Sequence, residues 1–356
     1  MAAPFPGLGQ KIKSQYSKAK ASGALLFTES AVVDLDEEVG GTTIPFEVRF
    51  APALAKKPTK DDGEKKKDDA SSPPPDPFAP PYIPDLYVAE DTVKEDEEDA
   101  GDQFVVLLNK FCVTPRHFLL VTKDFVKQTV PLSPIELFAA WSILKQLGVR
   151  EKHLCFLNCG VNSGASQPHK HLQLIPLSNG VAPFDDFIES NKPKNTKNPF
   201  HLPLPYASFT ALIDPPASAS PSSLASHLGD LFLHCLDLLI DHLRRLDASS
   251  SLPSSFRFSD LSYNVILTQS YMHLVSRSKE KYTTKSGREI SVNSLGFAGM
   301  VLVKEQEALE EIKEVGVLEV LKSVGYRAVE QGEEPTATDI EPAVIEAPGA
   351  AEDKEN

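Results

Sequence analysis

Two histidines and one glutamine alternate along a segment with the composition of a β-strand. Successive side chains of a strand point to opposite faces, so His169, His171 and Gln173 share one face. The other face carries Leu172 and Leu174, which suit a strand whose back packs on a core. The pattern therefore predicts two imidazoles and one carboxamide in a row, facing a site.

A loop of small residues precedes this strand. Gly160 and Gly164 are followed by Ala165, Ser166 and Gln167. Glycine lets the backbone approach a ligand closely, and successive N–H groups can then surround an anion. The loop therefore predicts a phosphate-binding turn next to the two histidines.

A His-x-His pair alone is compatible with ordinary packing, with a metal site or with catalysis. A metal site would need a third histidine, cysteine or carboxylate nearby, and Gln173 is a poor metal ligand. A carboxamide is a good neutral hydrogen-bond partner for a phosphoryl oxygen. The loop and Gln173 together favour phosphoryl or nucleotidyl transfer.

At these residues the sequence resembles the histidine-triad superfamily, in the transferase branch that carries His-x-His-x-Gln. Within that branch, GASQPHKHLQ is similar to the diadenosine tetraphosphate phosphorylases, also called bis(5′-nucleosyl)-tetraphosphate phosphorylases or ATP adenylyltransferases. The similarity extends to the segments 107–122, 262–278 and 291–304. It covers residues 8–325.

The resemblance implies phosphorolysis of diadenosine tetraphosphate to ATP and ADP. His171 would form a covalent nucleotidyl-histidine, Gln173 would hydrogen-bond a non-bridging oxygen, and His169 would help to orient that centre. Inorganic phosphate would then attack the intermediate. The expected partners also include adenylyl sulfate, and a divalent cation, Mg²⁺ or Mn²⁺, would accompany the substrate without a metal cage of its own.

The resemblance also assigns substrate contacts, carried over position by position: Lys57, Leu108, Asn109, Asn158, Gly164, Ala165, Ser166, Gln167, Asn293, Ser294, Leu295, Met300 and Lys304. Lys56 is an alternative to Lys57. From the residues alone, Met300 fits ordinary core packing, and Lys304 fits either a solvated strand end or a phosphate contact.

Three other functions fit part of the pattern. Sugar-1-phosphate nucleotidylyltransferases share His-x-His-x-Gln, but they usually carry proline where Lys170 stands. Dinucleoside polyphosphate hydrolases of the superfamily carry a third histidine in place of Gln173. A protein that only senses nucleotides would not need both histidines.

The charge of the chain is concentrated in two segments. The chain has 356 residues and a formal net charge of −14, and the segments 90–102 and 330–356 together account for all of it. The remainder is close to neutral, which disfavours nucleic acid as a partner but permits a positive pocket for a small anion. Four cysteines without a C-x-x-C pair and no apolar run of membrane-spanning length indicate an intracellular protein, cytoplasmic or also nuclear.

The spacing of apolar residues predicts an α+β fold, an antiparallel sheet flanked by helices. Helices are expected at 8–22, 134–147, 225–246 and 305–323. The resemblance adds a histidine-triad-type nucleotidyltransferase fold with two related halves, and a monomer. The expected segments are an N-terminal part, a mostly disordered insertion, two halves of the catalytic fold and an acidic disordered tail: 1–55, 56–102, 103–200, 201–325 and 326–356.

Overall fold

A computed structural model describes residues 4–55, 75–249, 252 and 256–328 of the chain. Its centre is an eight-stranded sheet in the order β10-β12-β11-β8-β9-β7-β5-β4, in which every neighbouring pair is antiparallel. The strands are β4 (Tyr87–Val93), β5 (Asp102–Leu108), β7 (Phe118–Thr122), β8 (His153–Cys159), β9 (His171–Pro176), β10 (Ser208–Leu212), β11 (Tyr263–Leu267) and β12 (Tyr271–Ser276).

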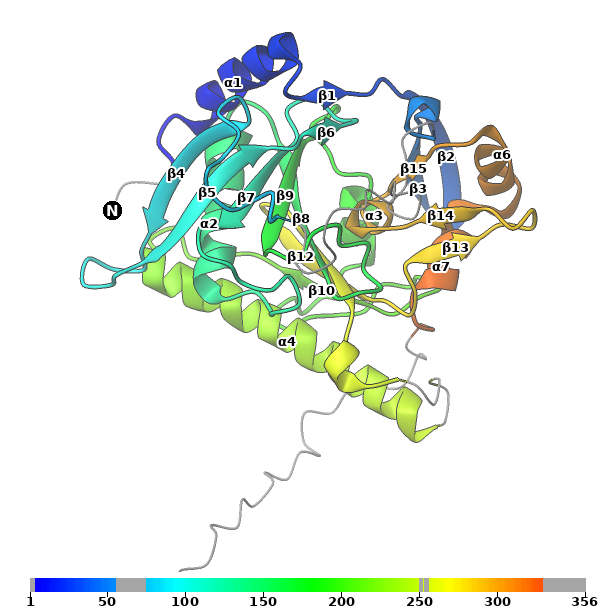
Figure 1. Cartoon of the computed structure of the whole chain (residues 1–356). Helices are drawn as coiled ribbons and strands as arrows, with labels where there is room; N and C mark the ends of the chain where they lie inside the picture. The colour runs from blue at the N-terminus through cyan, green and yellow to red at the C-terminus, as the bar shows by residue number, and fades with distance from the viewer. Residues whose placement is uncertain (1–3, 56–74, 250–251, 253–255, 329–356) are drawn as a thin grey trace, which may run out of the picture.

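Three long helices cover one face of this sheet: α1 (Leu8–Ser22), α2 (Pro134–Gly148) and α4 (Pro221–Ala248) (Figure 1). α2 begins at a capping box in which Ser133 and Glu136 satisfy each other's backbone N–H groups. α4 is the one helix in the described residues with the length and composition to cross a membrane, but its apolar side packs into this core.

A smaller layer covers half of the opposite face. Its three-stranded sheet has the order β15-β3-β2, and a second apolar core lies between it and the central sheet. The remaining elements are β1 (Leu26–Phe27), β2 (Ala31–Val39), β3 (Thr42–Phe50), β6 (Phe111–Cys112), α3 (Asp185–Asn191), β13 (Lys281–Thr283), β14 (Glu289–Ser291), α5 (Ser294–Phe297), β15 (Met300–Val303), α6 (Gln306–Val315), α7 (Val317–Val324) and the 3₁₀ turns η1 (Pro52–Leu54) and η3 (Phe258–Asp260).

The expected α+β class is confirmed, with an antiparallel sheet flanked by helices. Two expectations need correction. The segment 56–102 is not mostly disordered in its second part: β4 pairs with β5, with Ala89 and Val93 buried, because alternate side chains reach the core despite the acidic composition. The closing helix is two helices, since Gly316 adopts a φ of 87° between them.

Candidate active site

His171 and Gln173 lie on β9 in the middle of the central sheet and face the side without long helices. The intervening Leu172 belongs to the apolar core on the helical side. Lys170 also turns to that side, where its ammonium group forms a buried ion pair with Glu136 of α2 at 2.6 Å. The alternation of side chains expected from the sequence is therefore present.

Gln128, in the loop before α2, holds the backbone of His171. The paired register of β8 and β9 ends at Phe156 and Gln173. Beyond it, the Gln128 side chain accepts from the His171 N–H at 2.8 Å and donates to the Asn158 carbonyl at 2.8 Å. Gln128 thus bridges the two strands where the ladder stops, and it fixes His171 at the strand start.

The ring of His171 is held in one tautomer. Its Nδ1 lies 2.8 Å from the carbonyl oxygen of His169, which can only accept, so Nδ1 carries the hydrogen and Nε2 carries the lone pair. Burial lowers the pKa of His171 to about 4, and the nearby charge of His169 also lowers it. Near pH 7 the ring is therefore a neutral imidazole with a free Nε2, as a nucleophile at phosphorus requires.

The ring of His169 is fully engaged with protein atoms. Nδ1 lies 2.7 Å from Asp76 Oδ2, and Nε2 lies 2.8 Å from the carbonyl oxygen of Thr122. The rings of Phe78 and Phe125 pack beside it. His169 therefore acts on the site through its position and its carbonyl group, since its ring has no nitrogen left for a substrate.

A relay of side chains fixes the orientation of Gln173. Asn109 Nδ2 donates to His117 Nδ1 at 2.9 Å, so His117 carries its hydrogen on Nε2 and donates it to Gln173 Oε1 at 3.1 Å. Burial lowers the pKa of His117 to about 4, which keeps this tautomer uncharged. The N–H₂ end of Gln173 is left to point away from His117, as a donor for a phosphoryl oxygen.

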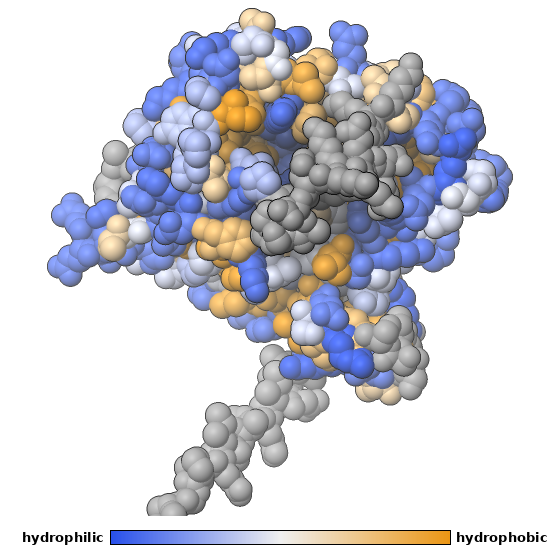
Figure 2. All heavy atoms as spheres, in the orientation of Figure 1, coloured by the Kyte–Doolittle hydropathy of each residue, from blue (hydrophilic) through white to orange (hydrophobic). Residues whose placement is uncertain are grey.

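Two cavities meet at Gln173, which lines both together with Asn109 and Phe111. The smaller, of about 180 Å³, contains His171 and a mostly apolar wall that includes Phe78. The larger, of about 430 Å³, lies between the central sheet and the three-stranded sheet. Figure 2 shows several separate groups of apolar side chains among hydrophilic ones on the face in view.

Asn158 connects the two halves of the fold below the loop. Its Oδ1 accepts from Asn264 Nδ2 at 2.9 Å and from Ser294 N and Oγ at 2.9 and 2.7 Å. Its Nδ2 donates to no other group in the described chain. The amide is therefore held by its oxygen. Asn158 is buried and lines neither cavity, so its contact with a substrate stays a prediction.

Arg277 places a buried positive charge beneath the small-residue loop. Its Nη1 donates to Asn264 Oδ1 at 2.5 Å and to the Ser163 carbonyl at 3.4 Å. Burial lowers the pKa of Arg277 to about 9, so the guanidinium stays charged near pH 7. No carboxylate lies within ion-pair distance of it in the described ranges, which leaves its field to act on a nearby anion.

Both glycines of the loop are required by the backbone. Gly160 and Gly164 have φ values of 89° and 82°. A Cβ on Gly164 would lie 2.9 Å from Asn293 Cβ, and one on Gly160 would lie 2.4 Å from Ser262 Oγ. The loop therefore packs directly on the segment that begins α5.

The structure brings most of the expected contact residues to the two cavities. The smaller is lined by Leu108, Asn109, Ser166 and Gln167, and the larger by Asn109, Asn293, Leu295, Met300 and Lys304. Gly164 and Ala165 lie in the loop just before Ser166 and line neither cavity.

One of the expected contacts differs from expectation, and one cannot be placed. Ser294 is fully buried, and its hydroxyl is used within the protein, donating to the Leu157 carbonyl at 2.7 Å, so it supports Asn158 and does not line a cavity. Asn109 lines both cavities, but its carboxamide is bonded to His117. Lys57, like Lys56, lies outside the described residues.

The described residues contain no cluster of three or more histidine, cysteine or acidic side chains that could hold a metal ion. The two carboxylates that line the larger cavity are engaged, Glu289 with Lys281 and Glu305 with Arg288.

The family model of the Ap4A phosphorylase N-terminal domain matches residues 4–189. The chain belongs to the Ap4A phosphorylase family. The model of the ATP adenylyltransferase C-terminal domain matches residues 202–327, so the two matches together span both halves of the fold.

Two yeast proteins of this kind are similar over most of the chain. Diadenosine 5′,5‴-P1,P4-tetraphosphate phosphorylase 2 of Saccharomyces cerevisiae is 33% identical over 320 residues, which are 86% of this chain and 90% of the relative. Protein APA1 of the same yeast is 28% identical over 313 residues, 85% and 88% of the two chains.

Solved structures of the yeast Ap4A phosphorylase Apa2 share the fold. The complex with AMP matches with a TM-score of 0.68 at 30% identity, covering 92% of this chain and 98% of that one. The complex with Ap4A matches with a TM-score of 0.67 at 29% identity, covering 91% and 98%. The family and the expected nucleotidyltransferase fold are thus both confirmed.

Proposed function

We propose that the protein catalyses the phosphorolysis of diadenosine tetraphosphate (Ap4A) to ATP and ADP through a nucleotidyl-histidine on His171. The observation that carries this proposal is the free, unprotonated Nε2 of His171 beside the aligned donor of Gln173. The enzyme is a nucleotidyltransferase that acts on nucleotides, and the reverse reaction joins ATP and ADP.

In the first step, His171 Nε2 attacks the α-phosphorus of one adenosine. The bond from that phosphorus to its bridging oxygen breaks, and ATP leaves with the electron pair. The ring of His171 becomes positively charged, and the His169 carbonyl, 2.8 Å from Nδ1, stabilises that charge. ATP is a weak base near neutral pH, so the step needs no strong general acid, and a glutamine can stand at position 173.

The cavities divide the substrate between them. The smaller one, with His171 and its apolar wall, suits the nucleoside of the attacked phosphorus. The larger one suits the leaving polyphosphate, because Lys304 lines it and has no ion-pair partner in the described part of the chain. Asn158 Nδ2 and the loop that contains Ser166 add donors next to the transferred group.

In the second step, an oxygen of inorganic phosphate attacks the same phosphorus, the P–N bond breaks, and ADP leaves with neutral His171 restored. Phosphate is proposed as the acceptor because Gln173 supplies no base to activate water. A Mg²⁺ or Mn²⁺ ion carried by the phosphates would neutralise their charge.

We also propose adenylyl sulfate as a second nucleotidyl donor. We further propose that the protein acts as a monomer.

The test is incubation of the purified protein with Ap4A and Mg²⁺, with and without phosphate, followed by separation of the nucleotides by anion exchange. The expected result is equal ATP and ADP, formed only when phosphate is present. ATP and AMP formed without phosphate would instead indicate a hydrolase. Turnover of sugar nucleotides in place of Ap4A would indicate a sugar-1-phosphate nucleotidylyltransferase.

A further inference from the structure

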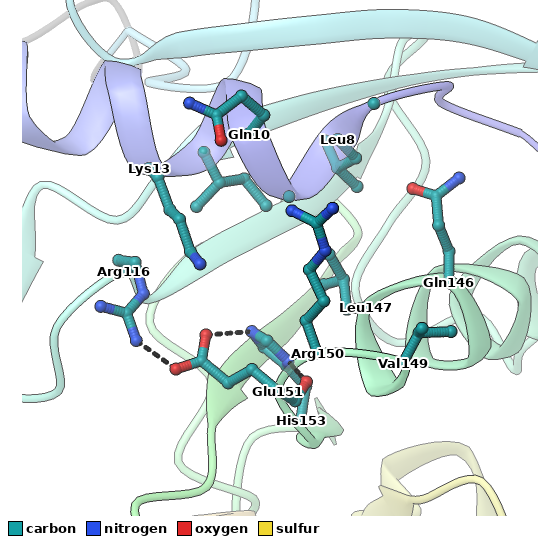
Figure 3. Close-up of a pocket in the computed structure, with 13 residues that line it drawn as sticks. Leu8, Gln10, Lys13, Arg116, Gln146, Leu147, Val149, Arg150, Glu151 and His153 are labelled. Atoms are coloured by element: carbon teal, nitrogen blue, oxygen red, sulfur yellow. Dashed lines mark hydrogen bonds and ion pairs between the residues drawn. The ribbon is translucent and has the colours of Figure 1, made fainter.

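A third cavity, of about 400 Å³, lies on the helical side of the molecule. It is enclosed by the first turn of α1, the end of α2 and the start of β8 (Figure 3). It shares no lining residue with the two cavities of the active site. Its volume is in the range of sites for small molecules.

The lining of this cavity is strongly basic. Lys13, Arg116 and Arg150 line it, against one acidic residue, Glu151. Figure 3 shows the three cationic groups directed into the same space between α1 and α2. Glu151 pairs with Arg116 at 2.5 Å, while Lys13 and Arg150 form no ion pair in the described chain. The cavity therefore keeps two positive charges without a counter-charge.

Two polar groups of the lining are incompletely bonded. Arg116 Nε and Gln146 Oε1 are buried, and neither has a hydrogen-bond partner in the described ranges. Unsatisfied buried groups are costly and rare, so each needs a reason. Arg116 also has a φ of 58°, a left-handed conformation that is uncommon for a residue with a Cβ. The strained turn holds a guanidinium at the cavity with donors still to be satisfied.

One of two further groups in the lining suits a negatively charged ligand. The first turn of α1 contributes Gly7 and Leu8 to the lining, and no side chain caps this 15-residue helix, so its positive dipole end is uncompensated. His153 is 5% exposed and donates from Nδ1 to the Glu151 carbonyl at 2.7 Å. Its Nε2 lies 3.9 Å from Glu151 Oε2, and because the hydrogen is on Nδ1 this ring offers no donor to an anion.

We propose that this cavity binds a small anion bearing a dianionic phosphate group, at a site separate from the catalytic centre. Two unpaired cations match the charge of a phosphate dianion, and the guanidinium of Arg150 can bind it through two hydrogen bonds. Apolar side chains beside the cations, Leu8 and Leu147, can also pack against a nucleoside. The ligand is either inorganic phosphate or a nucleoside monophosphate.

The test is equilibrium dialysis with radiolabelled phosphate in one arm and radiolabelled AMP in the other. One equivalent of an Ap4A analogue with methylene bridges at the α,β positions first fills the catalytic centre. The variant Lys13→Glu/Arg150→Glu reverses two exposed charges of the cavity. The matched control Lys11→Glu/Lys152→Glu makes the same change in charge at exposed neighbours that do not line it.

The expected result is one remaining site on the wild-type protein and on the control, with affinity weakened at least about tenfold in the cavity variant. Binding of both labels would identify the phosphate ion as sufficient, and binding of AMP alone would identify a nucleoside monophosphate. No remaining site on the wild type, or equal affinity in the cavity variant, would overturn the proposal. Lys13→Gln/Arg150→Gln repeats the test with a milder change, and unaltered phosphorolysis in both variants shows intact folding.

Discussion

His117 Nε2 donates a hydrogen bond to Gln173 Oε1 over 3.1 Å, and this contact decides which end of the glutamine amide faces the substrate. Asn109 Nδ2 donates to the other ring nitrogen of His117, Nδ1, at 2.9 Å, and this hydrogen bond determines the tautomer of His117. Asn109 therefore donates to His117, and His117 donates to Gln173. The amide N–H₂ of Gln173 is left to donate to the phosphoryl group.

Replacing His117 with phenylalanine should keep the packing at this position but remove the hydrogen bond to Gln173. Without the donor from position 117, the Gln173 amide can turn its oxygen towards the phosphate, and this oxygen would repel the phosphate oxygens. We expect kcat for phosphorolysis to fall by about 10- to 100-fold with a smaller change in KM. The same replacement at His201, which lines neither cavity of the active site, is the control. Equal losses in both variants would contradict the relay.

Gln173→His introduces an imidazole that can act as an acid and a base where the wild type has only a donor. The new ring would lie beside His117, and it could accept a proton from water near the intermediate. We expect a larger share of AMP relative to ADP among the products at fixed phosphate. An unchanged ratio of hydrolysis to phosphorolysis would show that position 173 does not select the acceptor.

His171→Ala should remove the nucleophile without loss of the fold, because the ring is uncharged and faces a cavity. We expect turnover to fall by at least about 10⁴-fold. Wild-type protein quenched in base after incubation with α-³²P-labelled Ap4A should retain label, which acid should release from a phosphoramidate. Label retained by the alanine variant would move the nucleophile elsewhere.

The sequence predicts the nucleophile strand well because the information there is local. Alternation alone places His171 and Gln173 together against Leu172, and a capping box alone marks the start of α2. The loop glycines are also recognisable, since only glycine tolerates their φ values next to a packed segment.

The groups that orient the site come from distant parts of the chain, and no local pattern reveals them. His117 reaches Gln173 only because β7 and β9 are neighbours in one register. Asp76 reaches His169 across 93 residues, from a proline-rich segment whose composition predicts disorder. Gln128 is a polar residue in a loop, and only the end of the β8–β9 ladder gives it a role.

Asp76→Asn tests the support behind His169. The Asp76 carboxylate lies 2.7 Å from His169 Nδ1, and the Thr122 carbonyl lies 2.8 Å from Nε2, so the two contacts together hold the ring. An amide at position 76 can accept but carries no charge, and the ring should then shift together with its carbonyl group. Because that carbonyl holds His171 Nδ1, we expect kcat to fall by roughly tenfold with little change in KM. Asp124→Asn is the matched control, because the Asp124 side chain makes no hydrogen bond to the His169 ring in the described structure, where only its backbone carbonyl approaches Nε2. An equal effect there would count against the role of Asp76.

Acid should destabilise the protein through its buried histidines, and His273 provides a way to isolate the effect. Burial lowers the pKa of His273 to about 3, below the value of 6.5 that it has in an unfolded chain. Between these values the unfolded state binds the proton and the folded state does not. Stability is therefore complete above about pH 6.5 and is lost as the pH falls towards 3.

The size of this loss can be stated for one histidine. At pH 5 the unfolded chain gains about 2 kcal/mol from protonating it, while the folded chain gains almost nothing. His273→Gln removes the titration and keeps a polar partner for Thr210, whose hydroxyl lies 2.8 Å from His273 Nδ1. Urea unfolding at pH 7 and pH 5 should show that the wild type loses about 2 kcal/mol more than the variant on acidification. Parallel losses in the two proteins would mean that His273 is protonated in the folded state, in conflict with its burial and with an Nε2 that has no partner in the described residues.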